Sequence, residues 1–300
     1  ETNAGGRYDP LTDSWSPTST VGAPMARYRP SAVWTGSEMI VWGGVRAGLG
    51  TTRTGARYDP VSDSWATTNS ADAPEARMLH TAIWTGGEMV VWGGCRFQGC
   101  ASFWSSGGRY DPASDTWSLT TLAGSPQARF SHQAVWTGSE MIVWGGSDGT
   151  VLDTGGRYDP GSDSWSATAL AGAPSARRSL AAVWSGEEML VWGGTDDADV
   201  LGDGARYDPV GDAWSPVAQA GAPEARRGHT GVWTGSEMIV WGGCADPSCL
   251  AFEESEFLAS GGRYDPAADS WSATSQLQAP FGRNLHTAEI GRSSRSGRGG

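Results

Sequence analysis

Residues 135–146 read VWTGSEMIVWGG and residues 155–165 read GGRYDPGSDSW, and both stretches recur along the chain. The second stretch occurs six times in the form GG/A-RYDP, each time followed by an aspartate and a tryptophan. Its copies begin at Gly5, Gly55, Gly107, Gly155, Gly204 and Gly261. The first stretch occurs five times, and its copies end at Gly44, Gly94, Gly146, Gly194 and Gly243. A fixed period of about fifty residues indicates a repeat architecture, so the repeat governs the interpretation of the rest.

Each unit of the repeat predicts four strands. Residues 80–84 (HTAIW) are rich in β-branched and aromatic residues and are followed by a glycine turn. Residues 88–94 (EMVVWGG) form an apolar run too short for a helix, closed by two glycines. Residues 107–110 (GGRY) stop at Asp-Pro, and residues 115–120 (DTWSLT) carry a tryptophan. The sequence therefore predicts an all-β chain in which each unit is one four-stranded antiparallel blade.

These motifs resemble the kelch repeat: a double glycine after the second strand, then a tyrosine with Asp-Pro, then a tryptophan. The resemblance covers residues 5–290 and implies a β-propeller, whose blades close on a ring and hide their strand edges. Residues 115–117 (DTW) also resemble the end of a sialidase Asp-box, but the glycine expected between them is absent. The kelch resemblance is therefore preferred.

The two ends of the chain predict how such a ring closes. Residues 5–16 supply a third and a fourth strand, five complete units follow, and residues 284–290 supply one more first strand. We expect a six-bladed kelch β-propeller with five complete four-stranded blades and a sixth blade split between the N- and C-termini and lacking one strand. Residues 1–290 would form this single domain, and the basic low-complexity residues 291–300 a disordered tail. The chain starts without Met inside a repeat, so we expect a mature or excised segment with any export signal upstream.

Composition restricts the classes of partner. The formal net charge is -12, which argues against a nucleic-acid or anionic-membrane surface, because such partners need a clustered positive face. No apolar run approaches the roughly 20 residues that a membrane helix needs. We therefore expect no nucleic-acid partner, no membrane insertion, no cofactor or metal, and a monomer.

The loops between second and third strands are the variable part of each unit. They differ in length and chemistry, whereas the turns at the other end of the blade hardly change. These loops are residues 45–54, 95–106, 147–154, 195–203 and 244–260. Because these loops do not follow the repeat pattern, we expect them to form the ligand-binding surface.

Aromatic and charged side chains in two of these loops are candidate ligand contacts. Trp104 is the one tryptophan outside the repeat, and exposed aromatics beside charges are typical of binding surfaces. The candidates are Arg96, Phe97, Phe103, Trp104, Phe252 and Phe257. The alternative is that these side chains only cover the edge of a blade.

The four cysteines form two pairs of the same spacing, each starting directly after WGG. We expect the disulfides Cys95–Cys100 and Cys244–Cys249, which would place the protein in an oxidising compartment: extracellular, periplasmic or at the cell surface. Zinc would need four converging ligands, which loops three blades apart do not easily supply. Free thiols are the remaining alternative.

An arginine in each link between blades is a second candidate set for binding. Six such arginines around a ring would crowd one mouth of the channel and could bind carboxylates or acidic sugars. They are Arg27, Arg77, Arg129, Arg177, Arg226 and Arg283. The alternative, which we favour, is that they belong to the kelch pattern and pair with neighbouring groups.

The histidines occupy one fixed position of the repeat, which argues against a catalytic role. The four histidines all lie three residues after a link arginine, at His80, His132, His229 and His286. Such single, separated groups suit packing rather than chemistry, because a catalytic site needs unlike groups converging at one point. The copper ligands of galactose-oxidase-like enzymes are also missing, so no ligand is transferred to this chain.

The sequence thus favours a non-catalytic recognition module that binds a protein or a glycan through the variable loops and the channel mouth. One alternative is a kelch-type enzyme acting on sugars, of the oxidase or sialic-acid mutarotase class. Another is a structural spacer within a larger surface protein.

Overall fold

The computed structural model of the chain describes residues 3–96, 99–247, 249 and 257–283, and within these ranges every regular element is a β-strand. The chain divides into two compact units, residues 1–168 (unit 1) and 169–300 (unit 2). The described residues contain five four-stranded antiparallel sheets, called blades 1 to 5 below. The predicted all-β class and the five complete four-stranded sheets are confirmed.

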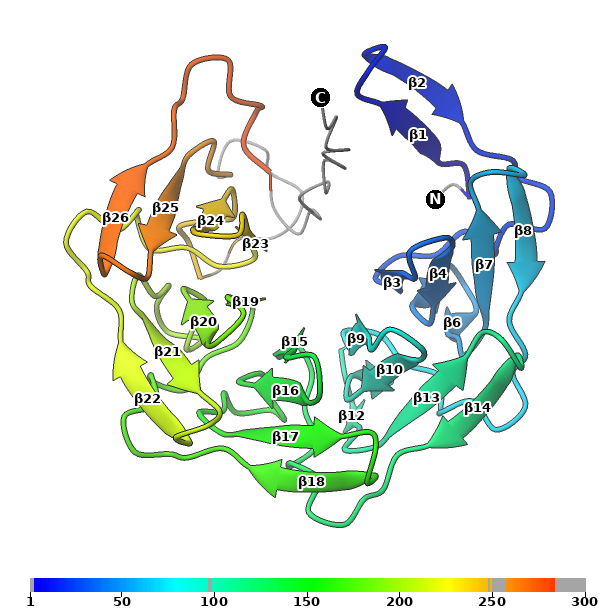
Figure 1. Cartoon of the computed structure of the whole chain (residues 1–300), viewed down its shortest axis with the longest axis horizontal. Coiled ribbons are helices and arrows are strands. Elements are labelled where there is room, and N and C mark those ends of the chain that lie inside the picture. Colours follow the sequence, from blue (N-terminus) through cyan, green and yellow to red (C-terminus); the bar gives the residue numbers. More distant parts are fainter. Residues whose placement is uncertain (1–2, 97–98, 248, 250–256, 284–300) are drawn as a thin grey trace, which may run out of the picture. The chain divides into compact units, whose positions relative to one another are not determined.

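Unit 1 contains a hairpin, three blades and two short arms (Figure 1). The hairpin is β1 (Gly6–Asp9) and β2 (Ser14–Pro17). Blade 1 is β3 (Ser31–Trp34), β4 (Met39–Trp42), β7 (Gly55–Asp59) and β8 (Ser64–Thr67). Blade 2 is β9 (Thr81–Trp84), β10 (Met89–Trp92), β13 (Gly107–Asp111) and β14 (Thr116–Leu119). Blade 3 is β15 (Gln133–Trp136), β16 (Met141–Trp144), β17 (Gly155–Asp159) and β18 (Ser164–Ala167). The arms are β5 (Val45–Arg46) with β6 (Gly50–Thr51), and β11 (Cys95–Arg96) with β12 (Ser102–Phe103).

Unit 2 contains two further blades. Blade 4 is β19 (Ala181–Trp184), β20 (Met189–Trp192), β21 (Gly204–Asp208) and β22 (Ala213–Pro216). Blade 5 is β23 (Thr230–Trp233), β24 (Met238–Trp241), β25 (Gly261–Asp265) and β26 (Ser270–Ala273). The first strand expected at residues 284–290 and the tail expected at 291–300 lie outside the described residues. The sixth blade, the closure of the ring and the single-domain organisation stay predictions.

Successive blades pack through alternate side chains of their second strands. In β10, Val90 and Trp92 are fully buried against the face of blade 3 that carries Met141 and Tyr158. The ring of Trp92 lies 5.2 Å from that of Trp165. Because side chains alternate across a strand, the intervening residues of the same strand face the preceding blade. Repetition of this contact accounts for most of the repeat's tryptophans.

The Asp-x-Trp motif joins each blade to the segment before it. The hydroxyl of Tyr110 donates to Oδ1 of Asp115 (2.6 Å), which also accepts the backbone N–H of Asn69 (2.9 Å). Nε1 of Trp117 donates to the carbonyl of the same Asn69 (3.0 Å). Burial, followed by the bond to Asp115, raises the pKa of Tyr110, so the phenol stays protonated as a donor. The repeated Tyr, Asp and Trp are therefore explained by packing and hydrogen bonding.

Candidate binding surface

The link arginines fasten the base of each variable loop. In blade 2, Nη1 of Arg77 donates to the carbonyls of Gly93 (2.9 Å) and Ser106 (2.6 Å), which stand at the two ends of the loop. Nε donates to the carbonyl of Glu75 (2.8 Å) and Nη2 to Oγ of Ser106 (3.2 Å). Burial lowers the pKa of Arg77 to about 10, so the side chain is charged at neutral pH.

This arrangement corrects the hypothesis that the arginines form a carboxylate trap. Four of them expose at most 1% of their surface, and their guanidinium groups are directed at main-chain carbonyls of their own blades; they are Arg77, Arg129, Arg177 and Arg226. Arg27 makes the same contacts, to the carbonyls of Gly43 and Thr54, while half-buried. Arg283 is exposed and lies over the ring of Trp241. The guanidinium groups of the buried four therefore hold the ends of the variable loops in position.

The described histidines pack between blades. In blade 2, Nε2 of His80 lies 2.8 Å from Oγ of Ser31, and its imidazole meets the ring of Trp42 edge-on at 5.3 Å. His132 and His229 make the same edge contact with the tryptophans of β10 and β20. The packing role expected from the repeat is confirmed for these three, and His286 lies outside the described residues.

These buried histidines predict a loss of stability in acid. Burial, with a smaller contribution from the charge of Arg77, lowers the pKa of His80 to about 3, against about 6.5 in the unfolded chain. The neutral form is favoured on folding, so this contribution is complete above pH 6.5 and is lost as pH falls from 6.5 towards 3. His80→Leu should remove it, and leucine is chosen because Leu180 occupies the same position of blade 4. We expect the free energy of unfolding of the native chain to fall by about 2 kcal/mol relative to the variant between pH 7 and pH 5, measured by urea denaturation. A difference between the two proteins that does not change with pH would contradict this role.

One variable residue in each link contacts the loop that follows. Met78 exchanges backbone hydrogen bonds with Cys95, at 3.0 and 2.9 Å. Tyr28 pairs with Val45, and Phe130 with Ser147, in the same way. These link residues were missed as site candidates from the sequence. The available signal was that the two residues after each link arginine vary although the arginine itself is constant.

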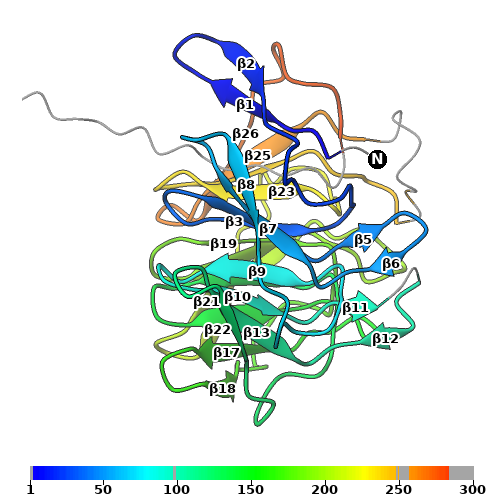
Figure 2. The same cartoon turned by 90° about the vertical axis from the view of Figure 1, so that its right-hand side faces the viewer.

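The loops of unit 1 carry an apolar cluster. Val45, Met78, Cys95 and Cys100 are buried together, with the half-buried rings of Tyr28, Phe103 and Phe130 packed against them. The rings of Phe103 and Phe130 are stacked at 5.4 Å. Figure 2 shows that the two arms, β5–β6 and β11–β12, lie on the same side of unit 1. Leu49 at the tip of the first arm is 63% exposed, so this arm also presents an apolar side chain to solvent.

The predicted contact residues are only partly brought together. Arg96 and Phe103 lie on the two strands of one arm, and Arg96 is exposed. Trp104 differs from the exposed aromatic we expected, because it is half-buried with the guanidinium of Arg77 5.8 Å from its ring centre. Phe257 pairs with Cys244 in unit 2. Phe97 and Phe252 lie outside the described residues.

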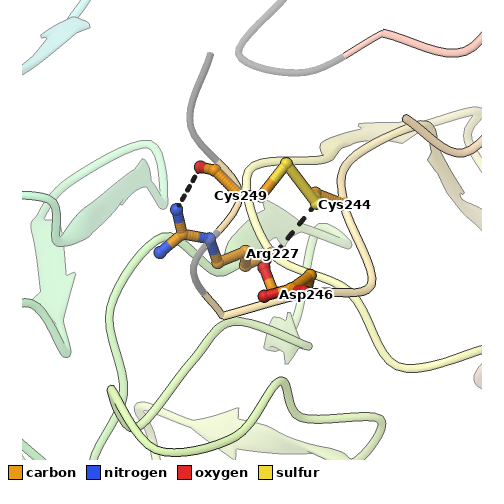
Figure 3. The surroundings of a disulfide bond; sticks show 4 residues. All are labelled: Arg227, Cys244, Asp246 and Cys249. Carbon is orange, nitrogen blue, oxygen red and sulfur yellow. Dashed lines mark hydrogen bonds between the residues drawn. A yellow bond between two sulfur atoms is a disulfide. The ribbon is translucent and has the colours of Figure 1, made fainter. Parts of the chain in front are cut away.

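Both expected disulfides are present in the structure. Cys95 is bonded to Cys100, and Cys244 to Cys249. Figure 3 shows the second bond, where Nη2 of Arg227 donates to the carbonyl of Cys249 (2.9 Å). Sγ of Cys244 lies 3.6 Å from the carbonyl oxygen of Asp246. Each bridge therefore restrains the start of a variable loop.

The variable loops of blades 1 and 2 differ in charge from the other variable loops, since residues 147–154 of blade 3 already contain two aspartates and no arginine. Residues 45–54 and 95–106 contain three arginines and no acidic residue, in a chain whose net charge is -12. Residues 195–203 of unit 2 contain four aspartates, of which Asp197 pairs with Arg178 (2.6 Å) and Asp203 with Arg177 (2.9 Å). The loops of blades 1 and 2 are thus a basic and apolar surface on an acidic protein.

Within the described residues, no three His, Cys, Asp or Glu side chains are grouped closely enough to hold a metal ion. No helix found there has the length and hydrophobicity to cross a membrane.

Comparison with known proteins agrees with the repeat. A family model described as the KLHDC2/KLHL20/DRC7 Kelch-repeats domain matches residues 2–173 and again residues 132–296. No curated protein matches the chain.

Proposed function

The chain belongs to the kelch-repeat family, whose domains are generally non-catalytic interaction modules, and from this premise we propose that it binds a protein through the loops of blades 1 and 2. The ligand would be an acidic segment that also carries an apolar anchor. Residues 45–54 and 95–106, together with the link residues Tyr28, Met78 and Phe130, would form the contact surface. Their combination of arginines and aromatic rings on an acidic chain is the observation that carries the proposal.

The arginines would contribute attraction and orientation. Arg46 and Arg96 directly follow Val45 and Cys95 of the apolar cluster, and neither loop contains an acidic side chain. Planar guanidinium groups bind carboxylates in a bidentate manner, and such contacts at the rim of an interface mainly set specificity and association rate. Binding should therefore weaken as ionic strength rises.

The aromatic rings would supply most of the affinity. Phe103 is half-buried and already held by its stack on Phe130, so little side-chain entropy remains to be lost on binding. Aromatic anchors of this kind dominate many interfaces. The disulfide and the Arg77 contacts at the loop base would keep this surface in place between binding events.

Selection of displayed random peptides against the whole chain tests this proposal. We expect the selected peptides to be rich in Asp and Glu around an apolar residue. Arg46→Gln with Arg96→Gln should weaken their binding about tenfold, and Phe103→Ala about tenfold or more. The matched control is Val61→Asp with Ala113→Asp, which makes the same change in net charge at exposed turns at the other end of the same blades.

An equal loss of affinity in the control would indicate a non-specific charge effect and would overturn the proposal. Selected peptides without acidic residues would overturn the assigned chemistry. A glycan ligand, expected from the sequence as the alternative to a protein, stays a prediction, as do the enzyme and spacer alternatives. The two disulfides support the further proposal that the protein works in an oxidising compartment, extracellular, periplasmic or at the cell surface.

A further inference from the structure

The second residue after each link arginine has a left-handed backbone. In each of the five blades its φ is positive, between 52° and 63°. These residues are Arg29, Leu79, Ser131, Ser179 and Gly228. A Cβ is crowded in this conformation, so any L-residue costs free energy there that glycine avoids. Only blade 5 has glycine at this position, and the other four blades carry a side chain where one is unfavourable.

The main chain at this position joins successive blades whatever the residue is. In unit 1 the carbonyl of Leu79 accepts the N–H of Ser131 (3.2 Å). In unit 2 the carbonyl of Ser179 accepts the N–H of Gly228 (2.9 Å), so a glycine takes part in the same bond. The contact between blades therefore requires the backbone conformation and does not require a particular side chain.

The size of the side chain at this position differs between the blades. Blades 3, 4 and 5 carry Ser, Ser and Gly, whereas blade 1 carries Arg29 and blade 2 carries Leu79. Leu285, at the same place in the sixth copy of the link, lies outside the described residues. Bulky side chains are rare at positive φ. Among the five blades, the two large side chains thus belong to the same two blades whose variable loops are basic and apolar.

Leu79 lies beside the apolar cluster of unit 1. Its half-buried side chain packs against the buried residues of that cluster, as do the rings of Phe103 and Phe130. The preceding residue, Met78, pairs with Cys95 at the start of the loop. Leu79 is therefore placed with the rings that we assign to ligand contact, and part of its surface is exposed.

We propose that Leu79 determines the specificity of the surface formed by the loops of blades 1 and 2, by contacting the apolar anchor of the bound segment. This inference rests on the proposed function and adds a link residue to that surface. Strained residues persist where their side chains serve a site, and the leucine supplies apolar contact area that serine or glycine would not. An aliphatic contact also rejects a charged anchor, because an unpaired charge is costly to bury. The anchor is therefore an uncharged, apolar side chain.

Leu79→Gly separates a ligand contact from a packing role. Glycine is the residue of blade 5 at this position and removes the backbone strain, which offsets the loss of half-buried contacts. The unfolding temperature should stay close to that of the native chain. Binding of the peptides selected on the native chain should weaken about tenfold. The matched control is Ser131→Gly, the same backbone change in blade 3, which should bind as the native chain does.

Leu79→Arg tests specificity without requiring a loss of binding. An arginine already occupies this backbone conformation in blade 1, where Arg29 has φ 54°. Peptides selected on the Leu79→Arg chain should carry an acidic residue in place of the apolar anchor, since guanidinium groups bind carboxylates. A purely structural role of Leu79 would leave the selected sequences as they are on the native chain.

The outcomes distinguish this proposal from the proposed function. Unchanged affinity of the Leu79→Gly chain, or unchanged peptide selection by the Leu79→Arg chain, would overturn the role of Leu79. The loop surface would stand without it if Phe103→Ala still weakened binding. An equal loss in Ser131→Gly would assign the effect to main-chain freedom and would also overturn the proposal. Selection of peptides without acidic residues on the native chain would instead overturn the proposed function itself.

Discussion

Replacing Arg77 by methionine should lower the free energy of unfolding of unit 1 by about 3 kcal/mol and its unfolding temperature by about 10 °C. Arg77 is fully buried, and its guanidinium bonds the carbonyls of Glu75, Gly93 and Ser106. Methionine fills similar space but donates nothing, so these buried carbonyls lose charge-assisted hydrogen bonds. Part of the loss is offset because no charge has to be buried in the variant.

The same substitution should loosen the loop whose base Arg77 holds. We expect faster hydrogen exchange across residues 95–106, beyond what the global loss of stability explains, with little change in the loops of blades 1 and 3. Arg27→Met is the matched control, because Arg27 makes the equivalent contacts while half-exposed and should cost only about 1 kcal/mol. Equal losses in the two variants, or an unchanged loop in Arg77→Met, would contradict the role assigned to the buried arginine.

Replacing Gly93 by alanine should also destabilise unit 1 strongly, by about 3 kcal/mol or more. The backbone of Gly93 has φ +69°, and an added Cβ would lie 2.5 Å from Cε1 of His132 and 3.0 Å from the carbonyl oxygen of Arg129. The left-handed backbone alone costs an L-residue about 1–2 kcal/mol. The overlap with blade 3 adds the remainder.

Gly48 allows the two costs of that substitution to be separated. It lies between β5 and β6 with φ +70°, and no atom comes within 4 Å of an added Cβ. Gly48→Ala should therefore cost only the backbone strain, and chemical denaturation of the two variants gives the difference directly. Adding His132→Ala to Gly93→Ala should recover part of the loss, because it removes the crowded ring. Equal costs at Gly48 and Gly93 would show that close packing of blades 2 and 3 is not what the double glycine provides.

The constant positions of the repeat were largely predictable from the sequence. Periodicity and strand-forming residues predicted the four strands of each blade, and the strict positions of tyrosine, histidine and tryptophan predicted packing roles. The contacts of Tyr110, Asp115 and Trp117 agree with that interpretation. The identical spacing of the cysteines was sufficient to predict both disulfides.

The binding surface was less predictable, because it depends on which side chains are buried. The sequence placed Arg77 and Trp104 among possible ligand contacts. In the structure the guanidinium of Arg77 lies over the ring of Trp104, and both residues are at the base of the loop. Conversely, Met78 and Phe130 are in the links, far in sequence from the loops that they contact. These contacts could not be predicted from the sequence period, because they depend on the conformation of the loops.

The most direct test of the account is a photo-crosslinking comparison between the two ends of blade 1. A photoreactive phenylalanine analogue is placed either at Leu49, 63% exposed at the tip of β5–β6, or at Val61, 93% exposed in the turn between β7 and β8. Each protein is irradiated with an acidic peptide selected on the native chain. We predict a covalent adduct at Leu49 and none at Val61. Adducts formed mainly at Val61 would contradict recognition through the variable loops.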